Sequence, residues 1–324
     1  MPKPKTLVIS GSIAIDRIMS FPGKYSELIN KNKLDSISVS IFLEDMKNAY
    51  GGVGGNIAYS LALLGDSPIL VGSVGPDGLI YMEHLAKQGV NIQHIYESEI
   101  PTATFNVISD GDQNQIGGFY PGAMFDSDAI SLDSWKGEDI IAVISPQDPK
   151  AMRRQVKQCQ DFNLALFYDV SQQVTNVSGE DMKSGVEAAE LLILNEYELS
   201  VLSDKTGLSL EEIKTKVPVV ITTLGKDGSI IEGSNTDKPI SVGVIKPKSV
   251  KDPTGAGDSY RSGFLYGYSR AWPLEICAKL GAAVAAYSVE TNGPQDHFFT
   301  PKEVEKRFIE SFGDNILPES LSND

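Results

Sequence analysis

The sequence predicts an α/β fold in which a mostly parallel sheet is covered by helices on both faces. Short apolar runs alternate with stretches of helical length over most of the 324 residues, and this alternation is typical of βαβ units. After Gly255 the pattern becomes helical only. Two further segments, 33–50 and 102–120, show strand-like alternation without an intervening helix, and they predict a second, smaller antiparallel sheet.

The strands of the main sheet are predicted from apolar runs bounded by turn residues. They lie at 6–10, 69–73, 140–145, 164–169, 191–194, 219–223 and 229–232. Helices are predicted between them at 55–64, 78–88, 149–161, 180–189 and 196–203, and three more follow at 256–270, 273–289 and 301–311.

The second sheet is predicted from apolar residues that recur at every other position. They are Ile37, Val39 and Ile41 in the first segment and Ala103, Phe105 and Val107 in the second. Both segments leave the main sheet near the carboxyl ends of its strands, where ligands of open α/β sheets bind, so we expect them to pair into a lid over the binding site. The predicted core covers 1–16, 51–100 and 126–324, and the predicted lid covers 17–50 and 101–125.

The net charge of −15 and the pI of about 4.7 exclude nucleic acid and anionic lipid as expected partners, because such a surface repels them. A phosphate site in this chain must therefore be local, built from backbone amides and a divalent cation. Cys159 and Cys277 are far apart in the sequence, and the three histidines lack metal-ligand spacing. We therefore expect neither a disulfide framework nor a histidine metal site.

The first apolar run is short and ends at Asp16 and Arg17 without a small-residue cleavage site. This predicts a first strand and not a signal peptide. No run of residues approaches the ~20 apolar positions that span a bilayer. We expect a cytoplasmic protein.

The strongest chemical signal is the run Asp252-Pro-Thr-Gly-Ala-Gly-Asp258, which opens a predicted helix. Its glycines allow a sharp turn that points successive N–H groups into one concavity at the positive end of the helix dipole. A phosphoryl group fits there, and the Asp258 carboxylate is placed to accept the proton of an attacking hydroxyl. The alternative interpretation is a glycine-rich turn with an aspartate helix cap.

A second glycine run, Gly51-Gly-Val-Gly-Gly-Asn56, opens another predicted helix. It permits close approach of a ligand to the backbone, and Asn56 can donate and accept hydrogen bonds with a pair of hydroxyls. The run is not a dinucleotide fingerprint, since Ile57 replaces the last glycine, and no Walker-type motif occurs. Taken alone, it is equally well explained as a tight strand-to-helix turn.

Asp16 lies in the run Gly11-Ser-Ile-Ala-Ile-Asp16, just past the first predicted strand. A carboxylate at the carboxyl end of a central strand can accept two hydrogen bonds from vicinal hydroxyls. Ser12 of the same run is a second candidate for substrate binding. The alternative for Asp16 is a solvated carboxylate in a turn.

Together these motifs resemble the ribokinase-like (PfkB) carbohydrate kinase family over essentially the whole chain. The resemblance implies a three-layer α/β/α domain with a small β-sheet lid, and a kinase that uses ATP and Mg²⁺. It implies that Asp258 is the catalytic base, that Gly255, Ala256 and Gly257 form the anion hole, and that Asp16, Gly52 and Asn56 hold the sugar hydroxyls.

The same resemblance extends to the nucleotide. Asn195-Glu-Tyr-Glu198 matches a motif that orders Mg²⁺ through water by way of Glu198, and Thr222-Thr-Leu-Gly225, with Gly228, matches the segment around the ATP phosphates and ribose. The implied ATP-binding residues are Asn195, Thr223, Gly225, Gly228, Gly255 and Gly257. Many relatives also bind K⁺ beside the anion hole, for which Asp252, Thr254 and Asn292 are the candidates.

Within this family, three stretches are similar to bacterial adenosine kinases: 11–27, 119–124 and 169–173. The residues themselves agree with a purine, which needs a flat apolar slot and side-chain amides. Phe105, Phe119 and Met124 are placed to enclose a base, while Gln172 and Gln173 follow a strand end and are placed to contact its edge or the ribose. The alternative for the two phenylalanines is packing within the lid.

The sequence therefore predicts transfer of a phosphoryl group from Mg·ATP to the 5′-hydroxyl of a ribonucleoside, with adenosine as the first substrate to test. A sugar kinase for ribose, fructose or 2-keto-3-deoxygluconate, a nucleoside kinase of broad specificity, and a nucleoside sensor without catalysis are the alternatives. The chain is expected to be a monomer or a homodimer that pairs through the exposed edges of the lid.

Overall fold

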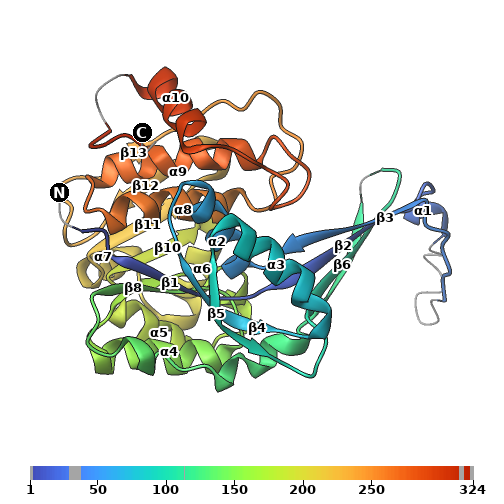
Figure 1. Ribbon diagram of the computed structural model, residues 1–324, viewed down its shortest axis with the longest axis horizontal. Helices are drawn as coiled ribbons and strands as arrows, with labels where there is room; N and C mark the ends of the chain where they lie inside the picture. Colours follow the sequence, from blue (N-terminus) through green and yellow to red (C-terminus); the bar gives the residue numbers. More distant parts are fainter. Residues whose placement is uncertain (1–2, 29–37, 113, 314–316, 322–324) are drawn as a thin grey trace.

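The computed structural model describes residues 3–28, 38–112, 114–313 and 317–321. These residues form two sheets (Figure 1), a large one in the body of the molecule and a four-stranded one that projects from it. The prediction of an α/β fold with a second, smaller sheet is confirmed.

The large sheet is mostly parallel. Strands β1, β4, β5, β8, β9, β10 and β11 pair in parallel, whereas β12 and β13 add an antiparallel edge. Their order across the sheet is β13-β12-β11-β10-β9-β8-β1-β4-β5. The bounds are β1 Thr6–Ser10, β4 Ile69–Val74, β5 Asn91–Glu97, β8 Ile140–Ile144, β9 Ala165–Tyr168, β10 Leu191–Asn195, β11 Val219–Thr223, β12 Ser229–Glu232 and β13 Ile240–Val242.

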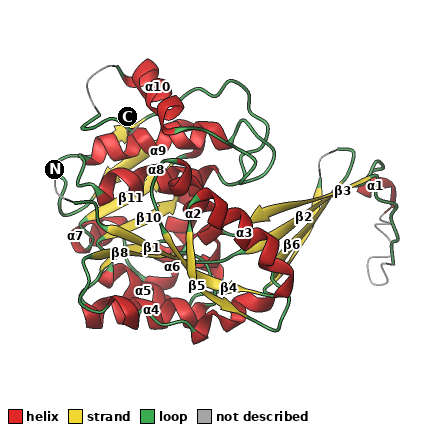
Figure 2. Ribbon diagram, in the orientation of Figure 1, coloured by secondary structure: helices red, strands yellow, loops and turns green. Residues whose placement is uncertain are grey.

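Helices cover both faces of this sheet (Figure 2). Alternate residues of β1 enter different cores: Leu7 and Ile9 pack with one layer of helices and Val8 with the other, as the period of two in a strand requires. One layer contains α2 Val53–Leu63, α3 Leu79–Gln88, α8 Ala256–Ser269, α9 Leu274–Ser288 and α10 Pro301–Phe312. The other contains α4 Pro149–Phe162, α5 Gly179–Ala188, α6 Glu196–Thr206 and α7 Leu210–Lys216.

Local sequence explains where several helices begin and end. Asn195 and Glu198 form a capping box at the start of α6, in which each side chain accepts a hydrogen bond from the other residue's backbone N–H. Helix α4 begins with Pro149 after the N-cap Asp148 and ends at Asn163, which adopts the left-handed conformation. These local signals are why the predicted and observed helices nearly coincide.

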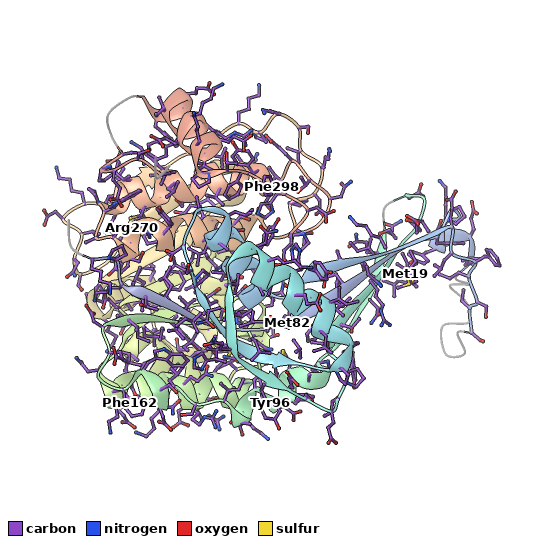
Figure 3. The ribbon with its side chains drawn as sticks, viewed as in Figure 1. Met19, Met82, Tyr96, Phe162, Arg270 and Phe298 are labelled. Atoms are coloured by element: carbon purple, nitrogen blue, oxygen red, sulfur yellow. The ribbon has the colours of Figure 1, made fainter. Side chains whose placement is uncertain are left out.

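The small sheet has the order β3-β2-β6-β7, with β2 Ala14–Ser20, β3 Asp45–Gly51, β6 Ala103–Ser109 and β7 Gln115–Tyr120. Strands β2 and β3 pair antiparallel, as do β6 and β7, whereas β2 and β6 pair in parallel. The predicted antiparallel pairing is therefore wrong for β2 and β6. A short helix, α1 Tyr25–Leu28, follows β2. In Figure 3, Met19 of β2 lies on the projecting sheet, whereas Met82 of α3 lies in the body of the molecule.

Several other elements differ from the prediction. Ile37 lies outside the described residues, and Val39 and Ile41 belong to no strand, because the pairing with β2 begins only at Asp45. Strands β2, β5 and β13 and helix α7 were not predicted from the sequence. No helix among the described residues is long and apolar enough to cross a membrane.

Candidate functional site

A cavity of about 350 Å³ lies where the small sheet meets the amino-terminal ends of α2 and α8. Every residue predicted to bind the substrate lines it: Ser12, Asp16, Gly52, Asn56, Phe105, Phe119, Met124, Gln172 and Gln173. Gly255, Asp258 and Thr254 line it as well. The structure thus brings together residues that are far apart in the sequence, and Asp16 and Asp258 share one cavity.

The amino terminus of α8 forms one wall. Its N-cap, Gly255, has φ 80° in the left-handed region, and a Cβ there would lie 2.6 Å from the Cβ of Pro294, so glycine is required. Asp258 follows in the first turn. The N–H of Ala256 donates to the Pro253 carbonyl at 3.1 Å, so in this structure that predicted anion-hole amide is engaged within its own loop.

The amino terminus of α2 forms the adjoining wall. Gly52 is its N-cap with φ 85°, and the Ser12 hydroxyl accepts a hydrogen bond from the N–H of Val53 at 3.0 Å. The serine thereby satisfies one of the unpaired donors at the helix start. This turn fixes Asn56, which is buried one turn into the helix.

A chain of hydrogen bonds orients Asp258. The Asn56 amide nitrogen donates to Asp258 Oδ2 at 2.8 Å, and Gln295 Nε2 donates to Asn56 Oδ1 at 2.9 Å. The Gln295 amide also contacts the hydroxyl of Tyr81, which donates to the carbonyl of Gly51 at 2.9 Å. A carboxylate only accepts hydrogen bonds, so the NH₂ end of the Asn56 amide must face Asp258. The second N–H of that NH₂ group remains available for a ligand.

Asp16 lines the same cavity as Asp258. It lies within β2, opposite Ala49 of β3, and not at the carboxyl end of a central strand as predicted. A Cβ on Gly51 would lie 2.5 Å from the Asp16 carboxylate, so this glycine makes room for it. Burial raises the pKa of Asp16 to about 7, and the nearby charges of Asp258 and Asp252 add to the effect.

Aromatic and amide side chains form the outer part of the cavity. Phe105 and Phe119 are directly paired across β6 and β7, and their rings are 38% and 49% exposed, which makes packing within the lid an insufficient account of them. Met124 is buried beside them. Gln172 and Gln173 come from the short 3₁₀ helix after β9, where Gln173 Oε1 accepts a hydrogen bond from Asn176 at 2.9 Å.

The residues expected to bind ATP lie outside this cavity, apart from Gly255. Asn195 and Thr223 end the neighbouring parallel strands β10 and β11, and Gly225 and Gly228 bound the 3₁₀ turn that follows. Gly257 is exposed in the first turn of α8. These positions share the carboxyl edge of the large sheet, where nucleotides bind in open α/β folds.

Glu198 fits a role in magnesium binding through water better than direct ligation. One of its oxygens accepts the Asn195 N–H in the capping box at 2.8 Å, which leaves the other free for a water of a hydrated ion. No cluster of three or more His, Cys, Asp or Glu side chains that could hold a metal ion is found among the described residues.

The residues considered for K⁺ lie on two adjacent loops. Asp252 accepts hydrogen bonds from the N–H groups of Thr254 and Gly293, so it joins both loops. The Asn292 carbonyl accepts a hydrogen bond from Lys47 of β3 at 3.3 Å, so the ammonium of Lys47 already contacts one of the candidate oxygens.

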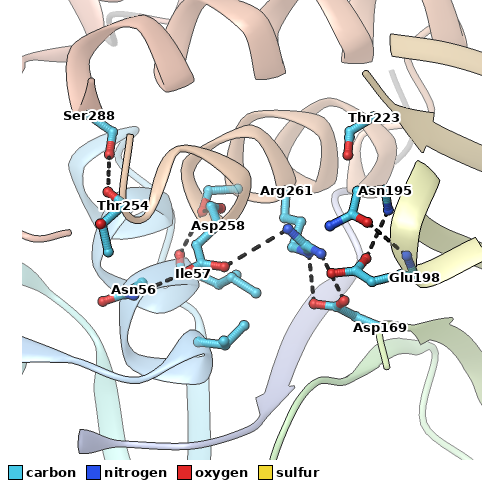
Figure 4. Close-up of polar contacts among 12 residues, drawn as sticks. Asn56, Ile57, Asp169, Asn195, Glu198, Thr223, Thr254, Asp258, Arg261 and Ser288 are labelled. Atoms are coloured by element: carbon cyan, nitrogen blue, oxygen red, sulfur yellow. Dashed lines mark hydrogen bonds and ion pairs between the residues drawn. The ribbon is translucent and has the colours of Figure 1, made fainter. Parts of the chain in front are cut away.

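Some residues of the site were not found from the sequence. Arg261, Gln295 and Tyr81 contact other site residues from behind the cavity wall (Figure 4 shows Arg261). Arg261 carried a signal, because it lies three residues after Asp258 in a predicted helix, on the same face. Gln295 and Tyr81 carried none, since only the fold brings them together. Additional lining residues are Ala14, Val53, Pro146, Asn176 and Pro294.

Comparison with known proteins agrees with this geometry. Residues 28–301 match the model of the pfkB family carbohydrate kinases. The chain is 30% identical over 295 residues to a nucleoside kinase of Methanothermobacter thermautotrophicus, covering 89% of this chain and 94% of that protein. It is 32% identical over 285 residues to a nucleoside kinase of Methanocaldococcus jannaschii, covering 86% and 92%.

Among solved structures, the nucleoside kinase of Burkholderia thailandensis in complex with inosine superposes with a TM-score of 0.84 at 30% identity, covering 95% of this chain and 98% of that one. The same protein in complex with ADP-inosine gives a TM-score of 0.83 at 29% identity, covering 98% and 99%. Fold, site and similarity all agree. The chain belongs to the pfkB family of carbohydrate kinases, and it is a phosphotransferase with the ribokinase-like fold.

Proposed function

We propose that this kinase transfers the γ-phosphoryl group of Mg·ATP to the 5′-hydroxyl of a ribonucleoside, with adenosine, and hence AMP formation in purine salvage, as the first case to test. The observation that carries the proposal is one cavity with a carboxylate at each end and an aromatic slot beside them. Its volume of about 350 Å³ lies in the range of small-molecule sites. The relatives named nucleoside kinases support the same class of acceptor.

In this proposal Asp16 and Asn56 hold the ribose hydroxyls so that O5′ points at Asp258. The O5′–H proton passes to the Asp258 carboxylate while O5′ forms a bond to the γ-phosphorus and the bond from that phosphorus to the β,γ-bridging oxygen breaks. The amides of Gly255 and Gly257 stabilise the charge that develops on the phosphoryl oxygens. Mg²⁺, when bound near Glu198 through water, neutralises charge on the ATP phosphates.

The slot formed by Phe105, Phe119 and Met124 favours a nucleoside over a free sugar. A ribose or fructose would leave two phenylalanine rings in contact with water, whereas a purine covers them. Gln172, Gln173 and Asn176 supply amides at the edge of the slot. Because an amide group can donate or accept, a nucleoside kinase of broad specificity is the second candidate, and the inosine complex of the Burkholderia protein favours it.

The test is an ADP-release assay of the purified protein with Mg·ATP against adenosine, inosine, guanosine, cytidine, ribose, fructose and 2-keto-3-deoxygluconate. Saturation by at least one nucleoside at micromolar concentration, with kcat/KM at least about 100-fold above every sugar, supports the proposal. A sugar that is used better than all nucleosides overturns it. Nucleoside binding without ADP release supports the sensor alternative.

The proposal extends to the remaining expectations. The kinase acts in the cytoplasm, and K⁺ bound near Asp252, Thr254 and Asn292 raises its activity. Comparing turnover in KCl with turnover in tetramethylammonium chloride tests the ion, and light scattering distinguishes the monomer from the homodimer that pairs through the small sheet.

A further inference from the structure

Arg261 is a buried cation directly behind the catalytic wall of the cavity. It lies on α8 one turn after Asp258 and is 6% exposed. Its Nη2 donates to Asp169 Oδ1 at 2.9 Å, and its Nε lies 2.7 Å from Asp169 Oδ2 as an ion pair. Figure 4 shows the guanidinium between Asp258 on one side and Asp169 on the other.

The remaining nitrogen of the guanidinium faces the predicted base. Arg261 Nη1 lies 3.9 Å from Asp258 Oδ1, which is an ion pair but too long for a hydrogen bond. A Cβ on Gly257 would lie 2.8 Å from the same nitrogen, so the cation is directly beneath the predicted anion hole. The two oxygens of Asp258 are therefore distinct: Oδ2 accepts from Asn56, whereas Oδ1 feels a positive charge and keeps its lone pairs available for a proton.

Arg261 places a positive charge next to a cavity that two carboxylates line. No lysine, arginine or histidine is among the described residues that line the cavity, and the chain carries a net charge of −15. The groups that face Asp258 come from several elements. They are Asp16 on β2, Tyr81 on α3, Asp169 after β9, Glu198 on α6 and Arg261 on α8.

Stability alone does not account for the pair. A buried salt bridge contributes little net stability, since desolvation of both charges offsets their attraction. Placed next to Asp258, however, the pair has a specific electrostatic effect. Burial raises the pKa of Asp258, and the charge of Arg261 is the largest influence that opposes the rise.

We propose that Arg261 is a positioning residue for phosphoryl transfer: anchored by Asp169, its guanidinium keeps Asp258 ionised and leaves Oδ1 as the atom that accepts the proton of the acceptor hydroxyl. The proposal deepens the function proposed above and rests on it. Asp169 fixes the guanidinium through both carboxylate oxygens, a geometry that arginine provides and lysine does not.

Two variants separate the charge from the packing. Arg261→Met with Asp169→Asn removes both charges, so that neither remains buried without a partner. Asp169→Asn alone keeps the cation and removes its anion. The matched control is Arg270→Met with Asp66→Asn, a largely buried pair with a 3.1 Å contact at the opposite end of the same helix. A thermal melt of each variant verifies folding.

The readout is the acid limb of kcat against pH at saturating acceptor, because kcat reports groups in the substrate complex, where the bound hydroxyls hold Asp16 ionised. Removing the cation raises the pKa of Asp258, so the limb of the double variant moves to higher pH by about one unit. At pH values on the acid limb, kcat of the double variant is therefore about 10-fold lower than that of the wild type. At high pH the two values of kcat become equal again. In Asp169→Asn, the carboxylate that partly neutralises the charge of Arg261 is absent. The pKa of Asp258 therefore falls, and the acid limb moves to lower pH. The control pair leaves it in place.

The proposal is overturned if the acid limb of the double variant lies within about 0.3 pH units of the wild-type limb. It is also overturned if Asp169→Asn leaves the limb in place or moves it to higher pH. If the double variant does not fold, the single variant decides. The assay uses whichever acceptor the wild type phosphorylates, so a sugar as the preferred acceptor defeats the nucleoside proposal and leaves this test intact. A carboxyl ¹³C NMR titration of Asp258 gives the same comparison without turnover.

Discussion

The two sheets of this kinase differ in what covers their apolar side chains. Every residue of β8 in the large sheet is buried under helices, whereas every residue of β7 in the small sheet is exposed. In the large sheet, helices of the same chain cover the apolar side chains. The small sheet presents Phe105 and Phe119 toward the cavity without a covering layer, and a bound acceptor would cover them. We therefore expect the large sheet to dominate the stability of the protein and the small sheet to select the acceptor.

The largest expected effect is on the chemical step, which is proposed to depend on Asp258 of helix α8 and not on either sheet. Asp258→Asn should lower kcat by about 10²–10⁴-fold, the usual contribution of a general base, with acceptor binding and thermal stability nearly unchanged. The amide keeps the size of the side chain but cannot take the proton. Turnover within a few-fold of the wild type would show that Asp258 is not the base.

The stability of the large sheet is tested at Phe167. This side chain on β9 is fully buried, so Phe167→Ala should lower the free energy of unfolding by about 3–5 kcal/mol through lost burial and the resulting cavity. Chemical denaturation measures the effect. If Phe119→Ala lowers the free energy of unfolding as much as Phe167→Ala does, the two sheets do not differ in their contribution to stability.

The substrate role of the small sheet is tested first at Asp16. Asp16→Ala should raise the KM of the acceptor about 10–100-fold, because charge-assisted hydrogen bonds to hydroxyls are lost, while the free enzyme remains folded. Initial rates against acceptor concentration measure it. An unchanged KM rules out the ribose role.

The raised pKa of Asp16 predicts a pH dependence of binding. Because this pKa is about 7, Asp16 is mostly protonated at pH 6 and mostly ionised at pH 8, and only the ionised form accepts charge-assisted hydrogen bonds from the hydroxyls. We expect the acceptor KM to fall up to about 10-fold between these values. Asp16→Asn provides the control, since its KM should not follow the same curve.

The smallest expected effect concerns the aromatic slot. Phe119→Ala should raise the KM for a nucleoside about 5-fold, as one partly exposed ring is lost from contact with the base, and should leave the melting temperature close to that of the wild type. A sugar acceptor serves as the control because it does not reach the slot. Equal losses for sugar and nucleoside would contradict the assignment.

The same contrast explains what could be predicted from the sequence. The strands 6–10 and 219–223 were predicted to the residue because continuous burial gives an apolar run between turn residues. In the small sheet, β2 was missed and residues 38–44 were assigned to a strand although they form none, since strands exposed on one or both faces need no such run. The cavity residues were found through glycine-rich turns and a family resemblance. Gln295 and Tyr81 were not, because the contact between them spans more than 200 positions of sequence.

The connection between the sheets limits how the chain can change. Only residues 11–13 separate β1 from β2, and a Cβ on Gly11 would collide with Ser145. Ala14 and Asp16 line the cavity, so alternate side chains of β2 point into it. Inserting a single residue in 11–13 would reverse that alternation and turn Asp16 away from the acceptor. The length of this linker is therefore as strict a requirement for activity as the identity of the residues it positions.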